Sequence, residues 1–258
     1  MARKPPRDPA ETPTKKLFAD QADVYSAYRP GYPAEMFAYF AGLAPGRALA
    51  WDCGTGSGQA AVGVAEHFDC VVATDASPEQ LDHATPHDRV EYRHAPVESA
   101  PLDDHSVDLI TVGQALHWFN HDAFYNEVRR VAAPGGVIAA WGYLAADIDE
   151  AMNTLMDYYR LDLVGSYWSP RVKYMVERYE TIPFPFEDID TPDFTATAEW
   201  SLDHWVGFLR SWSSTQEYLR QHGENPVDIV LPKLREAWGE AKTRLIRWPL
   251  FCRVGCVG

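Results

Sequence analysis

Hydrophobic and polar residues follow two alternating periodicities along the first half of the chain. Short continuous apolar runs predict buried parallel strands, whereas the amphipathic stretches between them predict helices. Strands are expected at 48–52, 70–75, 90–94, 107–112 and 136–143, and helices at 34–43, 59–67, 78–84 and 121–132. Because strands alternate with helices, this order predicts an α/β fold with a doubly wound, mostly parallel sheet.

The alternation stops near Asp147, and a different pattern follows. Aromatic residues become dense, and helical periodicity returns near 203–212 and 226–238. These features predict a helical elaboration over 147–240, beside a core that spans 17–146. The last segment, 241–258, contains an apolar, β-leaning run that is expected to return to the sheet as an antiparallel edge strand.

The N-terminal region changes character after Lys16. Residues 1–16 combine four prolines with charged side chains and offer almost nothing to bury, so they are expected to form a disordered tail. From Leu17 the pattern is helical, with Tyr25 and Tyr28 on one face, until the run RPGYP at 29–33 ends it.

Composition and charge narrow the choice of partners. The chain has 258 residues, 46% of them hydrophobic, which suits one large domain with an elaboration. Its formal net charge of −14 disfavours a nucleic-acid substrate, because polyanion binding depends on Lys and Arg. Four scattered cysteines make no disulfide framework, and no apolar run reaches the roughly 18 residues of a membrane span. A cytoplasmic protein without membrane contact is therefore expected.

The clearest chemical signal is the run DCGTGSG at 52–58. Glycines at alternate positions permit φ > 0 and let a ligand approach the backbone closely. Asp75 ends the next strand, near the offset of about 20 residues at which an acid can accept both ribose hydroxyls of a nucleoside. Ligands of open α/β sheets bind outside the carboxyl ends of the strands, so these segments predict a nucleoside-type cofactor there.

The glycine spacing favours one kind of nucleoside. Dinucleotide folds use G-x-G-x-x-G to approach a pyrophosphate, whereas this chain has G-x-G-x-G, which favours a cofactor without phosphates. With Asp75 and the strand entry at 101–110, this segment resembles the class I S-adenosylmethionine-dependent methyltransferases. The runs YRPGYP at 28–33, QALHWF at 114–119 and RWPLF at 247–251 resemble the type 11 branch, which includes trans-aconitate methyltransferase-like enzymes.

The resemblance covers residues 17–255, and it implies S-adenosylmethionine as cofactor and a Rossmann-like sheet of seven strands with an antiparallel last strand. By this resemblance, glycines of the loop would line the methionine part and Asp75 would bind the ribose. Tyr25, Tyr28 and Arg29 would close over the cofactor, although the tyrosines could equally be a packed helix face. The residues expected to bind the cofactor are Tyr25, Tyr28, Arg29, Asp52, Gly54, Thr55, Gly56, Gly58, Asp75, Ala76, Val97, Gln114 and Ala115.

One position departs from the family's pattern. Many relatives carry an acid just before the position of Val97, where it accepts a hydrogen bond from the adenine amino group, and this chain has Pro96 instead. Backbone groups at Val97 would then have to recognise the adenine edge.

His117 and Trp118 follow the fourth strand, where acceptor and methyl group should meet. Methyl transfer from a sulfonium is an in-line displacement that depends on positioning and on exclusion of water, so a base is optional. His117 is the candidate catalytic residue, as a base or as a hydrogen-bonding group, and a structural histidine is its alternative. Trp118 is expected to be a wall of the substrate pocket.

The expected function is methyl transfer to a small molecule by a monomer or homodimer. A carboxylate acceptor would need a cation, and nitrogen, oxygen and carbon acceptors all stay open. The alternative is a non-catalytic cofactor-binding or regulatory domain with the same fold, and the glycine spacing disfavours a third candidate, a nicotinamide-dependent oxidoreductase. Candidates for the cation are Arg160, Arg171, Arg210 and Arg220.

No metal site is expected. Cys252 and Cys256 have no histidine or further cysteine near them in the sequence. The run Asp103-Asp104-His105 lies in a polar turn before a strand, where a solvated loop is expected.

Overall fold

The central sheet has the architecture expected from the alternating pattern. In the computed structural model, which describes residues 28–258, five parallel strands lie in the order β3-β2-β1-β4-β5. Their bounds are β1 Leu49–Cys53, β2 Cys70–Asp75, β3 Val90–His94, β4 Val107–Gly113 and β5 Ala132–Gly142. The expected tail, the helix from Leu17 and Tyr25 lie outside the described residues.

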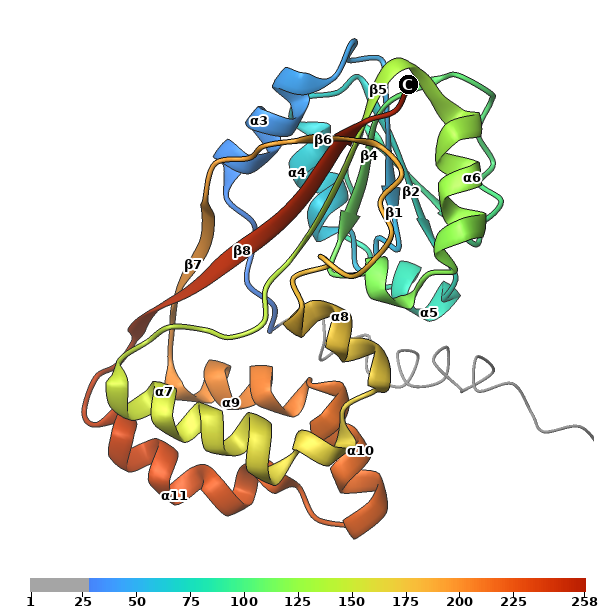
Figure 1. Cartoon of the computed structure of the whole chain (residues 1–258). Coiled ribbons are helices and arrows are strands. Elements are labelled where there is room, and N and C mark those ends of the chain that lie inside the picture. Colours follow the sequence, from blue (N-terminus) through green and yellow to red (C-terminus); the bar gives the residue numbers. More distant parts are fainter. Residues whose placement is uncertain (1–27) are drawn as a thin grey trace, which may run out of the picture.

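Helices cover both faces of this sheet (Figure 1). Helices α3 (Ala34–Leu43) and α4 (Gln59–Ala65) lie on one side, and α6 (His121–Val131) lies on the other. In α6, Phe124, Val128 and Val131 share the buried face at a spacing of three to four residues, and Asn120 caps the first turn by accepting from the Ala123 N–H. The doubly wound α/β fold is therefore confirmed.

The last strand is antiparallel, as expected. The prediction that it forms the edge of the sheet is wrong, because another strand pairs with its outer side. Strand β8 (Arg244–Cys256) pairs with β5 on one side and with β6 (Glu187–Ile189) on the other. Its first half also pairs with β7 (Phe194–Trp200), so the sheet of the described residues has eight strands rather than seven. Strand β7 buries Phe194, Ala196 and Trp200 and exposes residues between them, a two-residue alternation that is visible in the sequence FTATAEW.

The region 147–240 is therefore not wholly helical. Its helices form a bundle beyond the carboxyl ends of the parallel strands (Figure 1). The longer ones are α7 (Glu150–Asp157), α9 (Leu202–Arg210), α10 (Ser213–His222) and α11 (Pro226–Trp238). Short helical turns connect α7 to the sheet: η3 (Tyr158–Leu163), η4 (Gly165–Tyr167), η5 (Pro170–Val172) and α8 (Lys173–Val176).

The bundle and the sheet share one hydrophobic core, which fixes their relative position. Trp248 of β8 is fully buried, and its ring lies 4.8 Å from that of Trp200 and 5.9 Å from that of Phe208. Aromatic packing of this kind contributes beyond simple burial of area. Strand β8 thus joins the sheet and α9 into one body.

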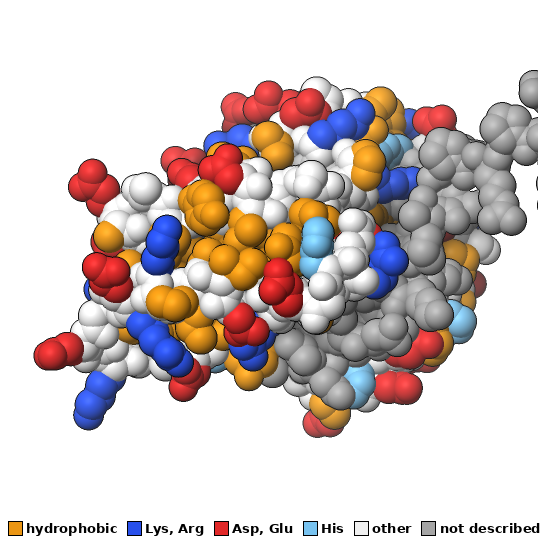
Figure 2. Space-filling view, turned by 90° about the horizontal axis from the view of Figure 1, so that it is seen from below, with side chains coloured by type: hydrophobic (Ala, Val, Ile, Leu, Met, Phe, Trp, Pro, Cys, Tyr) orange, Lys and Arg blue, Asp and Glu red, His pale blue; other side chains and the backbone are white. Residues whose placement is uncertain are grey.

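The underside of the molecule is mixed in character. Figure 2 shows apolar side chains gathered near the middle of this face, with Lys, Arg, Asp and Glu around them. The exposed large apolar residues of the described chain include Tyr158 and Leu161 of η3 and Ile229 of α11. Among the described residues, no helix is long and apolar enough to cross a membrane.

Candidate functional site

A cavity of about 270 Å³ opens at the carboxyl ends of β1, β2 and β4. This is the position that the strand order predicts for a ligand. It is lined by Tyr32, Asp52, Gly54, Thr55, Gly56, Ser57, Gln59, Ala60, Asp75, Ala76, Ser77, Gln80, Pro96, Val97, Glu98, Gly113, Gln114, Ala115, Trp118 and Phe119.

The glycine loop takes the backbone conformation that its sequence predicts. Gly54, Gly56 and Gly58 all have positive φ, at 64°, 56° and 83°. A Cβ on Gly54 would lie 2.9 Å from the Cβ of Ala115, so only glycine permits this close approach of the loop after β1 to the loop after β4.

Gly58 has a different place from the other two glycines. It is the N-cap residue of α4, and it does not line the cavity. A Cβ there would lie 2.1 Å from the hydroxyl oxygen of Tyr92. Gly58 therefore shapes the start of the helix, whereas Gly54 and Gly56 form the wall of the cavity.

Asp75 holds the glycine loop from the neighbouring strand. Its Oδ2 accepts a hydrogen bond from the Gly56 N–H at 2.9 Å, and its Oδ1 accepts from the Ser77 N–H at 2.9 Å. Burial raises the pKa of Asp75, and these two backbone bonds oppose that rise. Each carboxylate oxygen has a second lone pair, so Asp75 can also accept from a ligand's hydroxyl groups.

Asp52 lies fully buried beneath the same loop. Its Oδ2 accepts from the Thr55 hydroxyl at 2.6 Å, and its Oδ1 accepts from the Thr111 hydroxyl at 2.7 Å. Burial raises the pKa of Asp52 to about 6 in spite of these hydrogen bonds. The loop therefore rests on an acid that titrates close to neutral pH.

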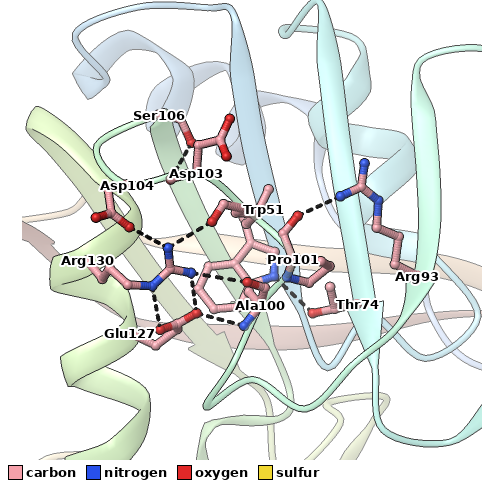
Figure 3. Close-up of polar contacts among 11 residues, drawn as sticks. Trp51, Thr74, Arg93, Ala100, Pro101, Asp103, Asp104, Ser106, Glu127 and Arg130 are labelled. Carbon is pink, nitrogen blue, oxygen red and sulfur yellow. Dashed lines mark hydrogen bonds and ion pairs between the residues drawn. The ribbon is translucent and has the colours of Figure 1, made fainter.

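The loop after β3 is clamped from α6 (Figure 3). Glu127 accepts from the Ala100 N–H at 2.7 Å, while Arg130 donates to the Ala100 carbonyl at 3.1 Å and to the Leu102 carbonyl at 2.8 Å. Arg130 also pairs with Glu127 at 2.6 Å. These bonds fix the chain just beyond the residues of this loop that line the cavity.

An acid does border the cavity in this loop, although not at the position of the family's pattern. Pro96, Val97 and Glu98 all line the cavity, so the carboxylate follows Val97 instead of preceding it. Glu98 belongs to the turn after the third predicted strand, which was expected at this edge of the sheet, but it was not among the residues expected to bind the cofactor.

Gln114 connects the first cavity to a second one. It has a positive φ of 57°, which is uncommon for a residue other than glycine, and its N–H donates to the Trp141 carbonyl at 2.9 Å. Its side-chain amide donates to the Tyr143 carbonyl at 3.1 Å. Gln114 and Trp118 line both cavities, so the two spaces meet at these residues.

The second cavity, of about 110 Å³, lies between the sheet and the helical bundle. Aromatic rings form much of its wall, and two arginines reach it. It is lined by Arg29, Gln114, His117, Trp118, Tyr143, Leu144, Arg160, Trp168, Val172, Met175, Phe208, Ser211, Trp212 and Ser213. Within residues 28–258, none of the residues that line it is an aspartate or a glutamate.

His117 is buried at the edge of this second cavity, in η2 (Leu116–Trp118). Its Nδ1 lies 3.1 Å from the Tyr179 hydroxyl, and 5% of the residue is exposed. Burial first, and then the charge of Arg171, lowers the pKa of His117 to about 3. The imidazole is therefore neutral at neutral pH and is a weak base.

The four arginines expected as candidate cations differ in whether they line the second cavity. Arg160 lines the second cavity and pairs with the exposed Asp157 at 3.0 Å. Arg171 donates to the Trp118 carbonyl at 2.9 Å and so braces η2. Arg210 and Arg220 pair with acidic residues on the surface and do not line the second cavity.

Apart from Gly58 and from Tyr25, which lies outside the described residues, the expected cofactor residues fall into three groups. Arg29 lines the second cavity, where its Nη2 lies 3.4 Å from the Ser211 carbonyl and its guanidinium lies over Phe208. Tyr28 packs on Gly207 of α9 and lines neither cavity. The first cavity is lined by Asp52, Gly54, Thr55, Gly56, Asp75, Ala76, Val97, Gln114 and Ala115.

Sequence reasoning missed several further residues of the first cavity. Gln59 and Ala60 start α4, and Ser77 caps α5 (Pro78–Leu81). They follow the glycine loop and Asp75 directly, so their positions beside those signals could have identified them. Tyr32 and Phe119 lie in the runs at 28–33 and 114–119 that carry the resemblance, but they were not among the residues expected to bind the cofactor.

The first cavity fits the cofactor that the resemblance implies. The wall combines a glycine loop that a Cβ would obstruct, a carboxylate at the end of β2 with spare lone pairs, and the backbone of 96–98 on the opposite side. These are groups that suit a nucleoside with a short amino-acid tail. Among residues 28–258, no cluster of three or more His, Cys, Asp or Glu could hold a metal ion.

Known proteins with similar sequences and structures agree with this geometry. The family described as a methyltransferase domain matches residues 51–140. A Dictyostelium discoideum protein assigned as a methyltransferase is 32% identical over 253 residues, covering 94% of this chain and 96% of that protein. A Saccharomyces cerevisiae protein assigned as an S-adenosylmethionine-dependent methyltransferase is 25% identical, over 82% of this chain and 86% of its own.

A solved structure extends the similarity to the whole fold. It is that of an Anaeromyxobacter dehalogenans protein described as a type II methyltransferase. Its sequence is 38% identical, the TM-score is 0.83, and the match covers 89% of this chain and 98% of that one. The similarity therefore includes the helical bundle as well as the sheet.

Proposed function

The chain belongs to the S-adenosylmethionine-dependent methyltransferases, and we propose that it methylates a small molecule on a carboxylate. When bound, S-adenosylmethionine supplies an electrophilic methyl group on a positively charged sulfur. The observation that carries the proposal is the second cavity, which meets the first at Gln114 and Trp118 and has two arginines but no acid among its described lining residues.

We propose that the first cavity holds the cofactor. Asp75 would accept from the ribose hydroxyls, the glycine loop would border the methionine part, and the backbone of Val97 with the Glu98 carboxylate would face the adenine. The contacts that support this assignment are the hydrogen bond from Gly56 to Asp75 and the clamp of Glu127 on the loop after β3. Both hold the cavity wall in place before any ligand binds, which favours tight binding.

The second cavity is the proposed acceptor site, covered by the bundle within 147–240. Arg160 donates from Nη2 to Asp157, and its remaining N–H groups have no hydrogen-bond partner among the described residues. A guanidinium can bind a carboxylate with two parallel hydrogen bonds. A cation at this place would hold an acid beside Gln114 and Trp118, where the two cavities meet.

The state of His117 supports a carboxylate rather than a hydroxyl or amine acceptor. With its pKa lowered to about 3, His117 is a poor proton acceptor, and the described lining of the second cavity contains no acid that could replace it. A carboxylate is already ionised at neutral pH and needs no base. His117 would then act as a neutral hydrogen-bonding group that positions the acceptor.

A label-transfer experiment tests this function. The protein is incubated with S-adenosylmethionine carrying a tritiated methyl group and with separate panels of small carboxylic acids, amines and alcohols. We expect label only in the acid panel, as an ester that releases tritiated methanol in alkali. Label in amines alone, or in alkali-stable products, would contradict the carboxylate assignment.

Arg160→Gln and Arg220→Gln form a matched pair for the same assay. Each arginine pairs with an acid three residues before it, but only Arg160 lines the second cavity. We expect Arg160→Gln to lose about tenfold or more in kcat/KM for the acid, in line with loss of a charge-assisted hydrogen bond, whereas Arg220→Gln should retain wild-type activity.

The setting of the enzyme is also part of the proposal. We propose a cytoplasmic enzyme that is a monomer or homodimer, which the four free cysteines and the mixed charge of the underside (Figure 2) support. In a homodimer, the exposed Tyr158, Leu161 and Ile229 would be the contact surface. Light scattering of the wild type and of Leu161→Glu distinguishes the two states, since the substitution would dissociate a dimer built on this face.

A further inference from the structure

We infer that the acceptor is an aromatic acid with a single ring, an inference that rests on the proposed function and names its substrate class. The second cavity joins a cationic group to a wall of aromatic rings in a small space. Each of these three features restricts the ligand in a different way, and together they select a compact, flat anion.

The aromatic wall is continuous on the side of the bundle. The ring of Trp212 lies 5.5 Å from that of Trp168, and 5.7 Å from that of Phe208 in an edge-to-face arrangement. Phe208 and Trp212 are almost fully buried, whereas Trp168 is half-buried. Aromatic rings prefer offset-stacked or edge-to-face neighbours, so this wall favours another flat ring over a puckered aliphatic one.

The volume sets the size of the ligand. The second cavity measures about 110 Å³ and opens into the first. An apolar cavity of roughly 150 Å³ in another protein holds one benzene molecule. The space is therefore of the order of size that one ring occupies.

The charged residues that line the second cavity favour a negatively charged ligand. Arg29 and Arg160 both line the cavity, and no aspartate or glutamate does so among its described lining residues. The chain as a whole carries a net charge of −14, so a lining with two cations and no acid is opposite to the rest of the molecule. An ammonium ligand would find aromatic faces here but would be repelled by the guanidinium of Arg160, which lines the cavity.

Transfer of the methyl group to the carboxylate of such an acid requires no proton transfer. A carboxylate oxygen forms the new bond to the methyl carbon, and the electron pair of the broken carbon–sulfur bond stays on sulfur, which becomes a neutral thioether. The product is a neutral methyl ester. Neutralising the acid removes its ion pair with Arg160, which favours release of the ester over rebinding.

Calorimetry with matched probes tests the inference. The full-length protein is saturated with S-adenosylhomocysteine and titrated with benzoate, with cyclohexanecarboxylate and with benzylamine. The first two have the same charge and nearly the same size but differ in ring planarity, and the third reverses the charge. We expect benzoate to bind about tenfold more tightly than cyclohexanecarboxylate and benzylamine to give no measurable heat.

The outcomes separate the two proposals. If cyclohexanecarboxylate binds as tightly as benzoate, the aromatic inference is wrong and the proposed acid methyltransferase stands. If benzylamine binds and the acids do not, or if no probe binds although S-adenosylhomocysteine does, both the inference and the proposed acceptor site are wrong.

Two variants test whether the preference for benzoate over cyclohexanecarboxylate arises in the second cavity. Trp168→Leu should reduce the advantage of benzoate over cyclohexanecarboxylate to less than threefold, since it removes one ring from the wall. Tyr158→Leu removes a ring that is exposed and outside the cavity, so it should leave the tenfold advantage intact. An equal loss in both variants would overturn the assignment of the preference to this wall, and the wild-type comparison stands even if Trp168→Leu fails to fold.

Discussion

Asp52 shows how one buried side chain can make stability depend on pH. Its folded-state pKa of about 6 lies above the value of 3.8 for an exposed aspartate. Between these values the unfolded chain releases the proton while the folded chain keeps it, so rising pH stabilises the unfolded state. The folded protein therefore loses stability as pH rises from about 4 to above 6, by roughly 2–3 kcal/mol from this group.

Substitution of Asp52 by asparagine isolates this effect. We expect the free energy of unfolding of Asp52→Asn, relative to that of wild type, to increase by roughly 2 kcal/mol between pH 4.5 and pH 7.5. Urea unfolding at both pH values measures it. A difference between the two proteins that does not change with pH would show that Asp52 ionises normally in the fold.

Gly58 tests whether backbone conformation or side-chain contact dominates at the glycine loop. With φ at 83° and the Tyr92 hydroxyl within 2.1 Å of a Cβ position, Gly58→Ala should introduce both strain and a clash. Gly223 has a similar φ of 75° but nothing within 4 Å, so Gly223→Ala introduces strain alone. We expect losses in unfolding free energy of about 1 kcal/mol for Gly223→Ala and clearly more for Gly58→Ala.

Chemical denaturation of the two alanine variants gives the comparison. Tyr92 is itself held by a hydrogen bond to the Thr85 carbonyl at 2.6 Å, so it cannot move aside without loss. Equal losses in both variants would mean that Tyr92 yields freely and that only φ requires glycine at residue 58.

The clamp between α6 and the loop after β3 links one element to the cofactor cavity. Glu127→Gln keeps the shape of the side chain but weakens its bonds to the Ala100 N–H and to Arg130. Because this loop lines the proposed adenine side, we expect the Kd for S-adenosylhomocysteine to rise about three- to tenfold. Calorimetry measures the change.

Glu66→Gln is the matched control for this clamp. Glu66 is exposed and lies 3.8 Å from Arg89, away from the cavity. It should leave the Kd unchanged. If the Kd is also unchanged in Glu127→Gln, the bonds from Glu127 to the loop after β3 do not contribute to cofactor affinity.

The elements of the parallel core could be predicted because each carries its own local signal. Apolar runs such as 70–75 and the cap at Ser77 report on structure within a few residues. Strand β6 has only three residues, 187–189, and two of them are exposed, so its sequence resembles a loop. Its pairing with β8 is a tertiary effect across more than sixty residues, which local periodicity cannot reveal.

The site shows the same division between local and distant signals. Gly54, Gly56 and Asp75 were predictable because the chemistry of a nucleoside site needs them at a fixed spacing along one βαβ unit. The second cavity was not, because Arg29, Arg160 and Phe208 come from three separate segments that meet only when the bundle packs on the sheet. Sequence offered four arginines as the cation, and packing leaves Arg160 alone of those four in the cavity.

The molecule as a whole is organised so that two cavities with different chemistry meet at one short segment. Residues 114–118 carry Gln114 with its strained backbone, Ala115 against the glycine loop, and Trp118 between the two spaces. Arg171 of η5 and Tyr179, which follows α8, hold this segment by hydrogen bonds to the Trp118 carbonyl and to the His117 ring. The bundle therefore supplies the acceptor's walls and also braces the place where both ligands would meet.

Binding of S-adenosylmethionine through Asp75 in the first cavity can be measured in a single set of calorimetric titrations. S-adenosylhomocysteine is titrated into wild type, into Asp75→Ala and into Asp88→Ala, an exposed aspartate outside the cavity that serves as control. We expect binding with one site per chain in wild type and Asp88→Ala, and a Kd at least about thirtyfold higher in Asp75→Ala, since two hydroxyl bonds to a charged group are lost. No binding to wild type at millimolar ligand, or wild-type affinity in Asp75→Ala, would contradict this mode of binding.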